Sequence, residues 1–268
     1  MDLKFLKEKA AAIRKDALFA INKAGRGFSG SAMSYVEILV ALYYGGVMNV
    51  DPKMPGSDEL DYFVLGKGHA AISWYAALAD IGYFEKSELD HYQKENSFLS
   101  LWPNLKIPGV KAPVQNYGQG LSFACGLAMS LKMDRKPNRV FAVLGDGELA
   151  CGQTWEAAMS ASHYNLDNLI VFVDNDGLQL DGPNKAVMDV QPIQDKFEAF
   201  GWKVIQVRDG HDFDQILDAL AKAFTTNRMP TLIWCHTVKG KGVPFAEGKE
   251  SYHDAVLSDA ELKSLYNA

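Results

Sequence analysis

The feature that most constrains the fold is a series of short, uninterrupted apolar segments separated by stretches with helical patterning. Three of these segments are residues 140–144, 169–173 and 231–235, and a helical stretch at 154–164 separates the first two. A strand that is apolar along its whole length is buried on both faces, and strands joined by helices pair in parallel. The sequence therefore predicts an α/β fold, with a parallel sheet flanked by helices on both faces.

The same patterning extends over the rest of the chain. Prolines at 103, 108 and 113 exclude a long helix from the irregular stretch 97–120. Further strands are predicted at residues 62–65 and 202–207, and further helices at 2–24, 37–44, 68–81, 121–132 and 213–224. Because no repeat or linker interrupts this order, we expect one domain spanning residues 1–268, with a C-terminal extension from about residue 237.

Composition excludes several classes of protein. The net charge of −6 and the pI near 5.5 argue against nucleic-acid binding. The charged N-terminal stretch is unlike a signal peptide, and no apolar run is long enough for a membrane span. Cys125, Cys151 and Cys235 show no CxxC spacing, so neither a disulfide framework nor a structural zinc site is indicated. We expect a soluble cytoplasmic protein.

Acidic turns follow two neighbouring predicted strands. Asp146 lies between Gly145 and Gly147 after the first strand, and Asp176 follows the second. Ligands of open α/β sheets bind beyond the carboxyl ends of the strands, so both carboxylates are expected at one edge. Glycines let the backbone approach a phosphate closely, and Mg²⁺ usually takes one or two protein carboxylates plus phosphate oxygens. The pattern indicates a site for a metal-bridged diphosphate.

The motif that contains these turns resembles the thiamine-diphosphate motif of transketolases, specifically of their N-terminal portion. It reads GDGEL, then GQTWEAAM, then LDNLIVFVDNDGLQLDG, within residues 140–182. Further matching segments occur in the family's order, namely VLGKGHAA at 64–71, PGV at 108–110, YGQGLSFACGLAM at 117–129 and HTVKGKGVPF at 236–245.

The resemblance implies the diphosphate domain of a thiamine-diphosphate-binding fold. Family members activate the cofactor with a glutamate from a pyrimidine-binding domain, and that domain has no counterpart in this sequence. The chain is thus expected to be the first subunit of a split transketolase. Its partner would be a separate C-terminal subunit carrying the pyrimidine domain, with self-association to an α2β2 assembly.

The resemblance also assigns residues that hold the cofactor. The cation would be Mg²⁺, or another divalent ion such as Ca²⁺ or Mn²⁺, bound by Asp146, Asp176 and the backbone carbonyl of Leu178. Family members usually carry asparagine at the position of Asp176, so this chain adds a negative charge there. The residues expected against thiamine diphosphate are His69, Gly118, Gly120, Gly145, Asp146, Gly147 and Asp176.

Catalytic roles are implied for His69, His253 and Glu156, and a substrate contact is also implied for His253. Glu156 resembles a family glutamate that lies between the two cofactor sites of a dimer. Lys239 and Lys241 either reach the site or are solvated.

Three positions depart from the family pattern. Phe28 and Trp102 stand where the family usually has histidines that bind substrate hydroxyls, and Cys151 replaces a glutamate. Neither aromatic side chain offers a hydrogen-bond acceptor like that of imidazole. The cofactor half of the site is therefore retained, while the substrate half is altered.

The function implied is transfer of a two-carbon ketol unit from a ketose-like donor to an aldehyde acceptor, both small molecules. One alternative is a different thiamine reaction, such as decarboxylation of a 2-oxo acid with acyloin formation, or acyl transfer. A second alternative is a non-catalytic scaffold subunit. Release of carbon dioxide from pyruvate would distinguish the decarboxylating reaction from ketol transfer.

Overall fold

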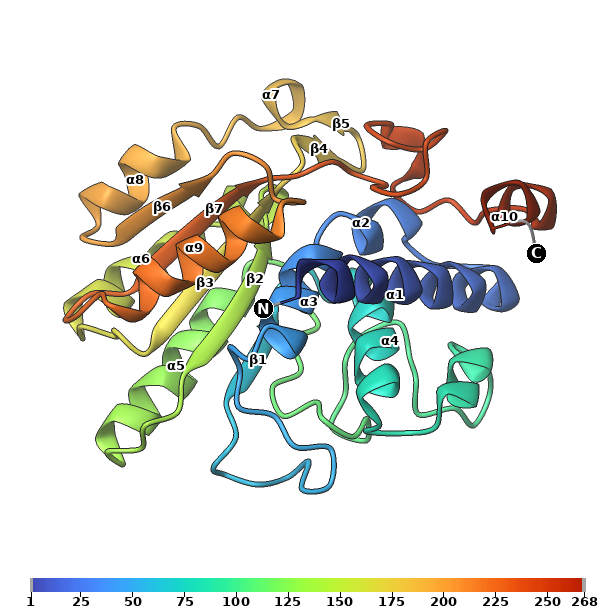
Figure 1. Cartoon of the computed structure of the whole chain (residues 1–268). Coiled ribbons are helices and arrows are strands. Elements are labelled where there is room, and N and C mark those ends of the chain that lie inside the picture. The colour runs from blue at the N-terminus through green and yellow to red at the C-terminus, as the bar shows by residue number, and fades with distance from the viewer. Residues whose placement is uncertain (1, 267–268) are drawn as a thin grey trace.

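A five-stranded parallel sheet forms the centre of the molecule in the computed structural model, which describes residues 2–266 (Figure 1). The strand order is β1-β2-β3-β7-β6, and every neighbouring pair is parallel. The bounds are β1 Tyr62–Leu65, β2 Val140–Gly145, β3 Leu169–Asn175, β6 Lys203–Val207 and β7 Thr231–His236. The prediction of a parallel sheet is confirmed.

Helices cover both faces of this sheet because the strand side chains alternate between two apolar layers. Phe141 and Phe172 enter one layer, whereas Ala142 and Val171 enter the other. The first layer is packed by α1 (Leu3–Ala24), α3 (Val36–Tyr44), α4 (Ile72–Ile81) and α9 (Phe213–Phe224). The second is packed by α5 (Gly120–Met133), α6 (Gly152–His163) and α8 (Ile193–Ala199). The fold class is therefore as predicted.

The parallel register brings several strand ends to one edge of the sheet, the carboxyl edge. Gly145 at the end of β2 pairs with Asp174, and Asn175 at the end of β3 pairs with His236. Asp146 and Asp176 follow these strands directly, so the fold places both acidic turns at the same edge, as expected.

The glycine- and serine-rich stretch after α1 holds a short buried helix, α2 (Ser29–Met33), which the sequence pattern did not indicate. A Cβ added at Gly30 would lie 2.5 Å from the backbone oxygen of Tyr252, so only glycine allows the C-terminal segment to pass here. That segment runs from the end of β7 along α2 to α10, which packs against α1 (Figure 1).

The remaining elements are short. They are β4 (Leu178–Gln179), β5 (Gly182–Pro183), α7 (Asn184–Val187), α10 (Asp259–Tyr266) and the 3₁₀ helices η1 (Gly68–Ala70), η2 (Lys86–His91), η3 (Gly147–Ala150) and η4 (Glu250–Tyr252). Within residues 2–266, no helix has the length and apolar character needed to cross a membrane.

Candidate cofactor site

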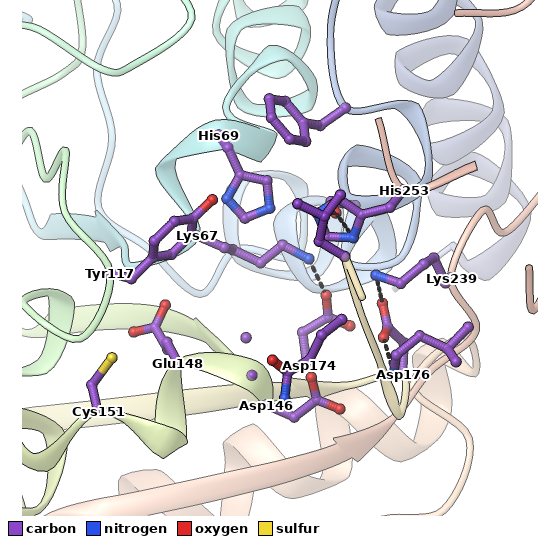
Figure 2. A pocket seen from close by; sticks show the side chains of 17 residues that line it. Lys67, His69, Tyr117, Asp146, Glu148, Cys151, Asp174, Asp176, Lys239 and His253 are labelled. Atoms are coloured by element: carbon purple, nitrogen blue, oxygen red, sulfur yellow. Dashed lines mark hydrogen bonds and ion pairs between the residues drawn. The ribbon is translucent and has the colours of Figure 1, made fainter. Parts of the chain in front are cut away.

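A cavity of about 380 Å³ opens at the carboxyl edge of the sheet (Figure 2). Segments from both ends of the chain and from its middle enclose it. Its lining is Phe28, Ser31, Lys67, His69, Tyr117, Gly145, Asp146, Gly147, Glu148, Cys151, Asp174, Asp176, Leu178, Gln179, Leu180, Lys239 and His253. The structure therefore brings most of the predicted site residues into one space.

Two carboxylates from neighbouring strand ends face this cavity. Asp146 accepts a hydrogen bond of 2.7 Å from the backbone N–H of Gly177, which ties the two acidic turns together. Asp176 accepts a bond of 3.0 Å from the N–H of Leu178 through Oδ1, and its Oδ2 pairs with Lys239 Nζ at 2.8 Å. Both side chains are therefore held by local contacts at the edge of the sheet.

Burial and mutual repulsion alter the acidity of these groups. Burial, followed by the repulsion from Asp176, raises the pKa of Asp146 to about 7. Burial also raises the pKa of Asp176, although Lys239 opposes it. Two buried carboxylates that resist ionisation together are stabilised by a shared positive charge, so the pair suits a cation.

A second buried ion pair lines the same cavity. Lys67 contacts Asp174 Oδ2, and Asp174 also accepts hydrogen bonds from Ser34 (2.6 Å) and Thr237 (2.5 Å). Burial would raise the pKa of Asp174, but Lys67 and the two hydroxyl donors together outweigh it and lower the value. Asp174 is consequently an ionised, fully partnered group that fixes Lys67 in the wall of the cavity.

Imidazole and aromatic rings form the opposite wall. The ring centroid of Phe28 lies 4.9 Å from that of His69 and 5.7 Å from that of His253. Burial, followed by the charge of Lys67, lowers the pKa of His69 well below its usual value. This wall is therefore uncharged near neutral pH.

Two predicted glycines sit where a side chain would not fit. Gly118 has a φ of +76°, and a Cβ there would lie 2.4 Å from the Cβ of Cys151. A Cβ at Gly120 would lie 2.6 Å from the Cα of Gly66, on the loop that leads to His69. Neither glycine lines the cavity itself, but both permit the close backbone packing beside it.

The other predicted residues have varied positions. Leu178 and Cys151 line the cavity, and Lys239 reaches it, whereas Lys241 is half-buried and lies 3.8 Å from Glu247. Trp102 lies behind His69, with ring centroids 6.2 Å apart, and is not part of the lining. Glu156 is exposed on α6, outside the cavity.

Several lining residues were not assigned to the site from the sequence, and they are Ser31, Lys67, Tyr117, Glu148, Asp174, Gln179 and Leu180. Both carboxylate oxygens of Glu148 are buried without a hydrogen-bond partner among residues 2–266, and burial raises its pKa to about 8. Gln179 on β4 packs against Gly147, and its Nε2 is likewise buried and unpartnered within the described chain. Nothing in the sequence placed Glu148 and Gln179 in the site, because a polar residue next to a turn is ordinarily exposed to solvent.

The residues present fit an acceptor-rich, negatively charged group with a cation. His69 Nδ1 and Gln179 Nε2 are buried nitrogens without a partner in the part of the chain that is described, so they are left to bind an acceptor. Within that part, no three His, Cys, Asp or Glu side chains form a metal cluster. A cation at Asp146 would thus share its coordination with ligand oxygens, as Mg²⁺ commonly does with phosphates.

Fold and cavity together define an α/β domain with a charged cavity at the carboxyl edge of a parallel sheet. The family model described as "Transketolase, thiamine diphosphate binding domain" matches residues 6–268. The chain belongs to the transketolase family.

Some of the similar proteins are about as long as this chain, and others are much longer. The chain is 39% identical over 260 residues to the 6-deoxy-6-sulfo-D-fructose transketolase subunit of Clostridium sp. (strain MSTE9), covering 97% of this chain and 94% of that one. It is 34% identical to an apulose-4-phosphate transketolase subunit of Phocaeicola vulgatus, covering 96% of this chain and 90% of that protein.

Full-length transketolases are much longer than this chain. The human transketolase is 37% identical, but the match covers 95% of this chain and only 40% of the human protein. The solved transketolase structure from Leishmania mexicana superposes with a TM-score of 0.92 at 26% identity, over 98% of this chain and 41% of that one. The chain therefore corresponds to about two fifths of these enzymes.

Proposed function

We propose that this chain is the cofactor-anchoring subunit of a split transketolase that transfers a ketol unit from a ketose-like donor to an aldehyde acceptor. The observation that carries the proposal is the convergence of Asp146, Asp176 and His69 on one cavity at the edge of the sheet. Subunit-sized relatives that are named transketolase subunits support it. In this proposal the chain is a single diphosphate domain with a C-terminal extension from about residue 237.

The first task of the chain is to hold the cofactor. Asp146, Asp176 and the backbone carbonyl of Leu178 would bind Mg²⁺ or another divalent ion such as Ca²⁺ or Mn²⁺. His69 would donate to the diphosphate through the nitrogen that lacks a partner within residues 2–266. Thiamine diphosphate, when bound, supplies the electron sink that carbon–carbon bond cleavage requires.

Glycines also contribute to the proposed cofactor-binding site. Gly145 and Gly147 flank Asp146 and leave the backbone open to the cavity, where both residues are part of the lining. Gly118 and Gly120 would keep the neighbouring loop close enough for its backbone to reach the cofactor.

The second task is to orient the substrate. His253 and Phe28 line the cavity, so His253 would bind a donor oxygen while Phe28 offers only apolar surface. Trp102 would act through its contact with His69. Glu156 would act between two cofactor sites in an oligomer, since it is exposed on α6.

A partner chain is the third element of the proposal. The pyrimidine-domain subunit would close the cavity beside Tyr117 and Leu180, which line it and remain about half exposed. It would also bring the activating glutamate, and two copies of each chain would form an α2β2 assembly. The match to only 40% of human transketolase supports a division of this kind.

A second candidate reaction is favoured by Phe28. An apolar ring beside two imidazoles suits a donor with fewer hydroxyls, such as a 2-oxo acid that loses carbon dioxide and forms an acyloin. The two reactions are separated by supplying the assembled complex with a ketose phosphate or with pyruvate. Ketol transfer without carbon dioxide release supports the first proposal, and carbon dioxide release with no ketol transfer supports the second.

A further inference from the structure

Three buried side chains outside the cavity lining form a continuous hydrogen-bonded triad, Arg14, Glu37 and His211. Arg14 on α1 donates to both carboxylate oxygens of Glu37 on α3, at 2.6 and 2.5 Å. Glu37 Oε2 also lies 2.9 Å from Nδ1 of His211, in the loop before α9. The three side chains are at most 9% exposed, so these contacts are shielded from water.

The bonds around His211 define which of its ring nitrogens carries the proton. Nε2 accepts the backbone N–H of Val238 at 2.9 Å. A neutral imidazole has one donor and one acceptor nitrogen, so the proton lies on Nδ1 and is donated to Glu37. Burial would raise the pKa of Glu37, but Arg14 and His211 outweigh it and lower the value to about 2. An ionised carboxylate therefore holds the ring with Nε2 directed at Val238.

Val238 begins segment 238–253, which leads from the end of β7 to His253 in the cavity. The N–H of Gly248 donates to the carbonyl of Lys239 at 2.9 Å, so the segment folds back onto the residue next to Val238. The turn η4 and His253 follow Gly248 closely. A shift of the backbone at Val238 is therefore passed on to the end of the segment that carries His253.

The triad touches the same segment at a second point. Gly242 has a φ of +85°, and a Cβ added there would lie 2.8 Å from Cδ of Arg14. Between the two contacts, the N–H of Gly240 donates to the carbonyl of Gly30 on α2 at 3.0 Å. The first part of the segment thus lies against the N-terminal helices, and the bond from Val238 to His211 fixes where it begins.

We propose that His211 is a positioning residue, which fixes segment 238–253 through Val238 and so places His253 for the donor substrate. This inference rests on the proposed function, because it assumes that His253 binds a donor oxygen. His211 is not part of the cavity lining, so it acts through the segment. A small displacement of a group that orients a substrate is enough to slow the reaction.

Two substitutions distinguish the two ring nitrogens of His211. Glutamine places a polar atom near the position of Nε2, so His211→Gln can still accept the N–H of Val238. Asparagine reaches only the position of Nδ1, so His211→Asn keeps the contact with Glu37 and leaves Val238 without this acceptor. In the complex with the pyrimidine-domain subunit, His211→Asn should lower kcat/KM for a ketose phosphate about tenfold, whereas His211→Gln should stay within about threefold of the native value.

The kinetic comparison has a matched control and two contrary outcomes. His163→Asn, which is exposed at the end of α6, should leave kcat/KM unchanged. Equal losses in His211→Asn and His211→Gln would overturn the inference, because they would show that the acceptor for Val238 is not what matters. A native value in His211→Asn would overturn it as well.

The bond itself can be measured on the native chain, so the test does not depend on a variant that folds. In the ¹⁵N spectrum at neutral pH, His211 should show one protonated and one unprotonated ring nitrogen. The unprotonated nitrogen should show a scalar coupling to the amide nitrogen of Val238 across the N–H···N bond. A proton on Nε2 would overturn the inference.

Hydrogen exchange separates positioning from a general loss of stability. In His211→Asn the amides of segment 238–253 should exchange at least about tenfold faster, while those of β3 keep their native rates. His211→Gln should restore slow exchange in the segment. Faster exchange along the whole chain in His211→Asn would indicate a merely structural histidine and would overturn the inference. Failure of the proposed function would instead appear as absent turnover by the native complex, with exchange in the segment still as expected.

Discussion

His69 and His253 stack on one another across the cavity, with ring centroids 5.6 Å apart and planes inclined by 18°. One ring follows β1 and the other follows η4, so the stack joins distant parts of the chain. Burial, followed by the charges of Lys239 and Lys67, lowers the pKa of His253 to about 3. Two neutral imidazoles can exchange hydrogen bonds with a substrate without placing positive charge beside the cofactor.

The neutrality of His253 is open to direct measurement. The C–H resonances of its ring should show no titration between pH 5 and pH 8, because the pKa near 3 lies far below this range. His253→Asn identifies the signal by its loss, and free imidazole in the same sample gives the pH reference. A midpoint between pH 6 and pH 7 would contradict this description of the wall.

The two proposed metal ligands should differ in their tolerance to substitution. Asp146→Ala should weaken cation-dependent binding of thiamine diphosphate at least about 100-fold, because a carboxylate ligand of a divalent ion is lost. Asp176→Asn keeps an oxygen ligand and removes one negative charge, so its effect should stay below about tenfold. Calorimetry on the assembled complex measures both, and equal damage from the two variants would refute the assigned roles.

Glu148 should make the stability of the chain depend on pH. Burial raises its pKa to about 8 in the folded chain, so the folded state keeps a proton that the unfolded state releases near pH 4.5. The stability that this proton supports is present below pH 4.5 and is lost as the pH rises toward 8. Glu148→Gln mimics the protonated group and should raise the free energy of unfolding by about 1–3 kcal/mol at pH 8 relative to pH 5.

Urea denaturation of the native chain and of Glu148→Gln at both pH values checks this prediction. A difference between the two proteins that is the same at pH 5 and pH 8 would mean that the buried carboxyl does not retain its proton.

Phe28 should set a preference among donors. A buried substrate hydroxyl without a partner costs about 1–3 kcal/mol, or roughly five- to 150-fold in binding. Phe28→His should therefore raise kcat/KM of the assembled enzyme for a ketose phosphate while leaving a short deoxy donor unchanged or worse. A parallel change for both donors would show that this ring does not contact substrate hydroxyls.

Most secondary structure could be predicted because burial imposes a clear pattern on these segments. The strand Tyr62–Leu65 and the helix Phe213–Phe224 have the expected bounds, and the other predicted strands and longer helices differ by only a few residues. The exception is residues 68–81, where a 3₁₀ turn at Gly68–Ala70 precedes the helix Ile72–Ile81. The helix Ser29–Met33 was missed because glycine and serine favour turns. Contacts with distant segments stabilise it, namely its burial beneath the C-terminal segment and the hydrogen bonds that Arg14 and Ser73 donate to its carbonyls.

The cavity could be predicted only in part. Asp146 and Asp176 were predictable because strand ends share an edge, and His69 because of its motif. The pairing of Lys239 with Asp176 and the burial of Glu148 depend on how distant loops meet, which spacing along the chain does not encode. Trp102, which was expected at the substrate, is not part of the cavity lining, and its ring centroid lies 6.2 Å from that of His69.

We expect this chain to hold a thiamine cofactor that works only with a second subunit. The most direct test is ketol transfer by the purified chain with thiamine diphosphate and Mg²⁺, before and after adding a pyrimidine-domain subunit. We expect no turnover by the chain alone and cofactor-dependent turnover by the mixture, which Asp146→Ala should abolish. Thiamine-dependent turnover by the chain alone, in a preparation shown to be free of the partner, would contradict this expectation.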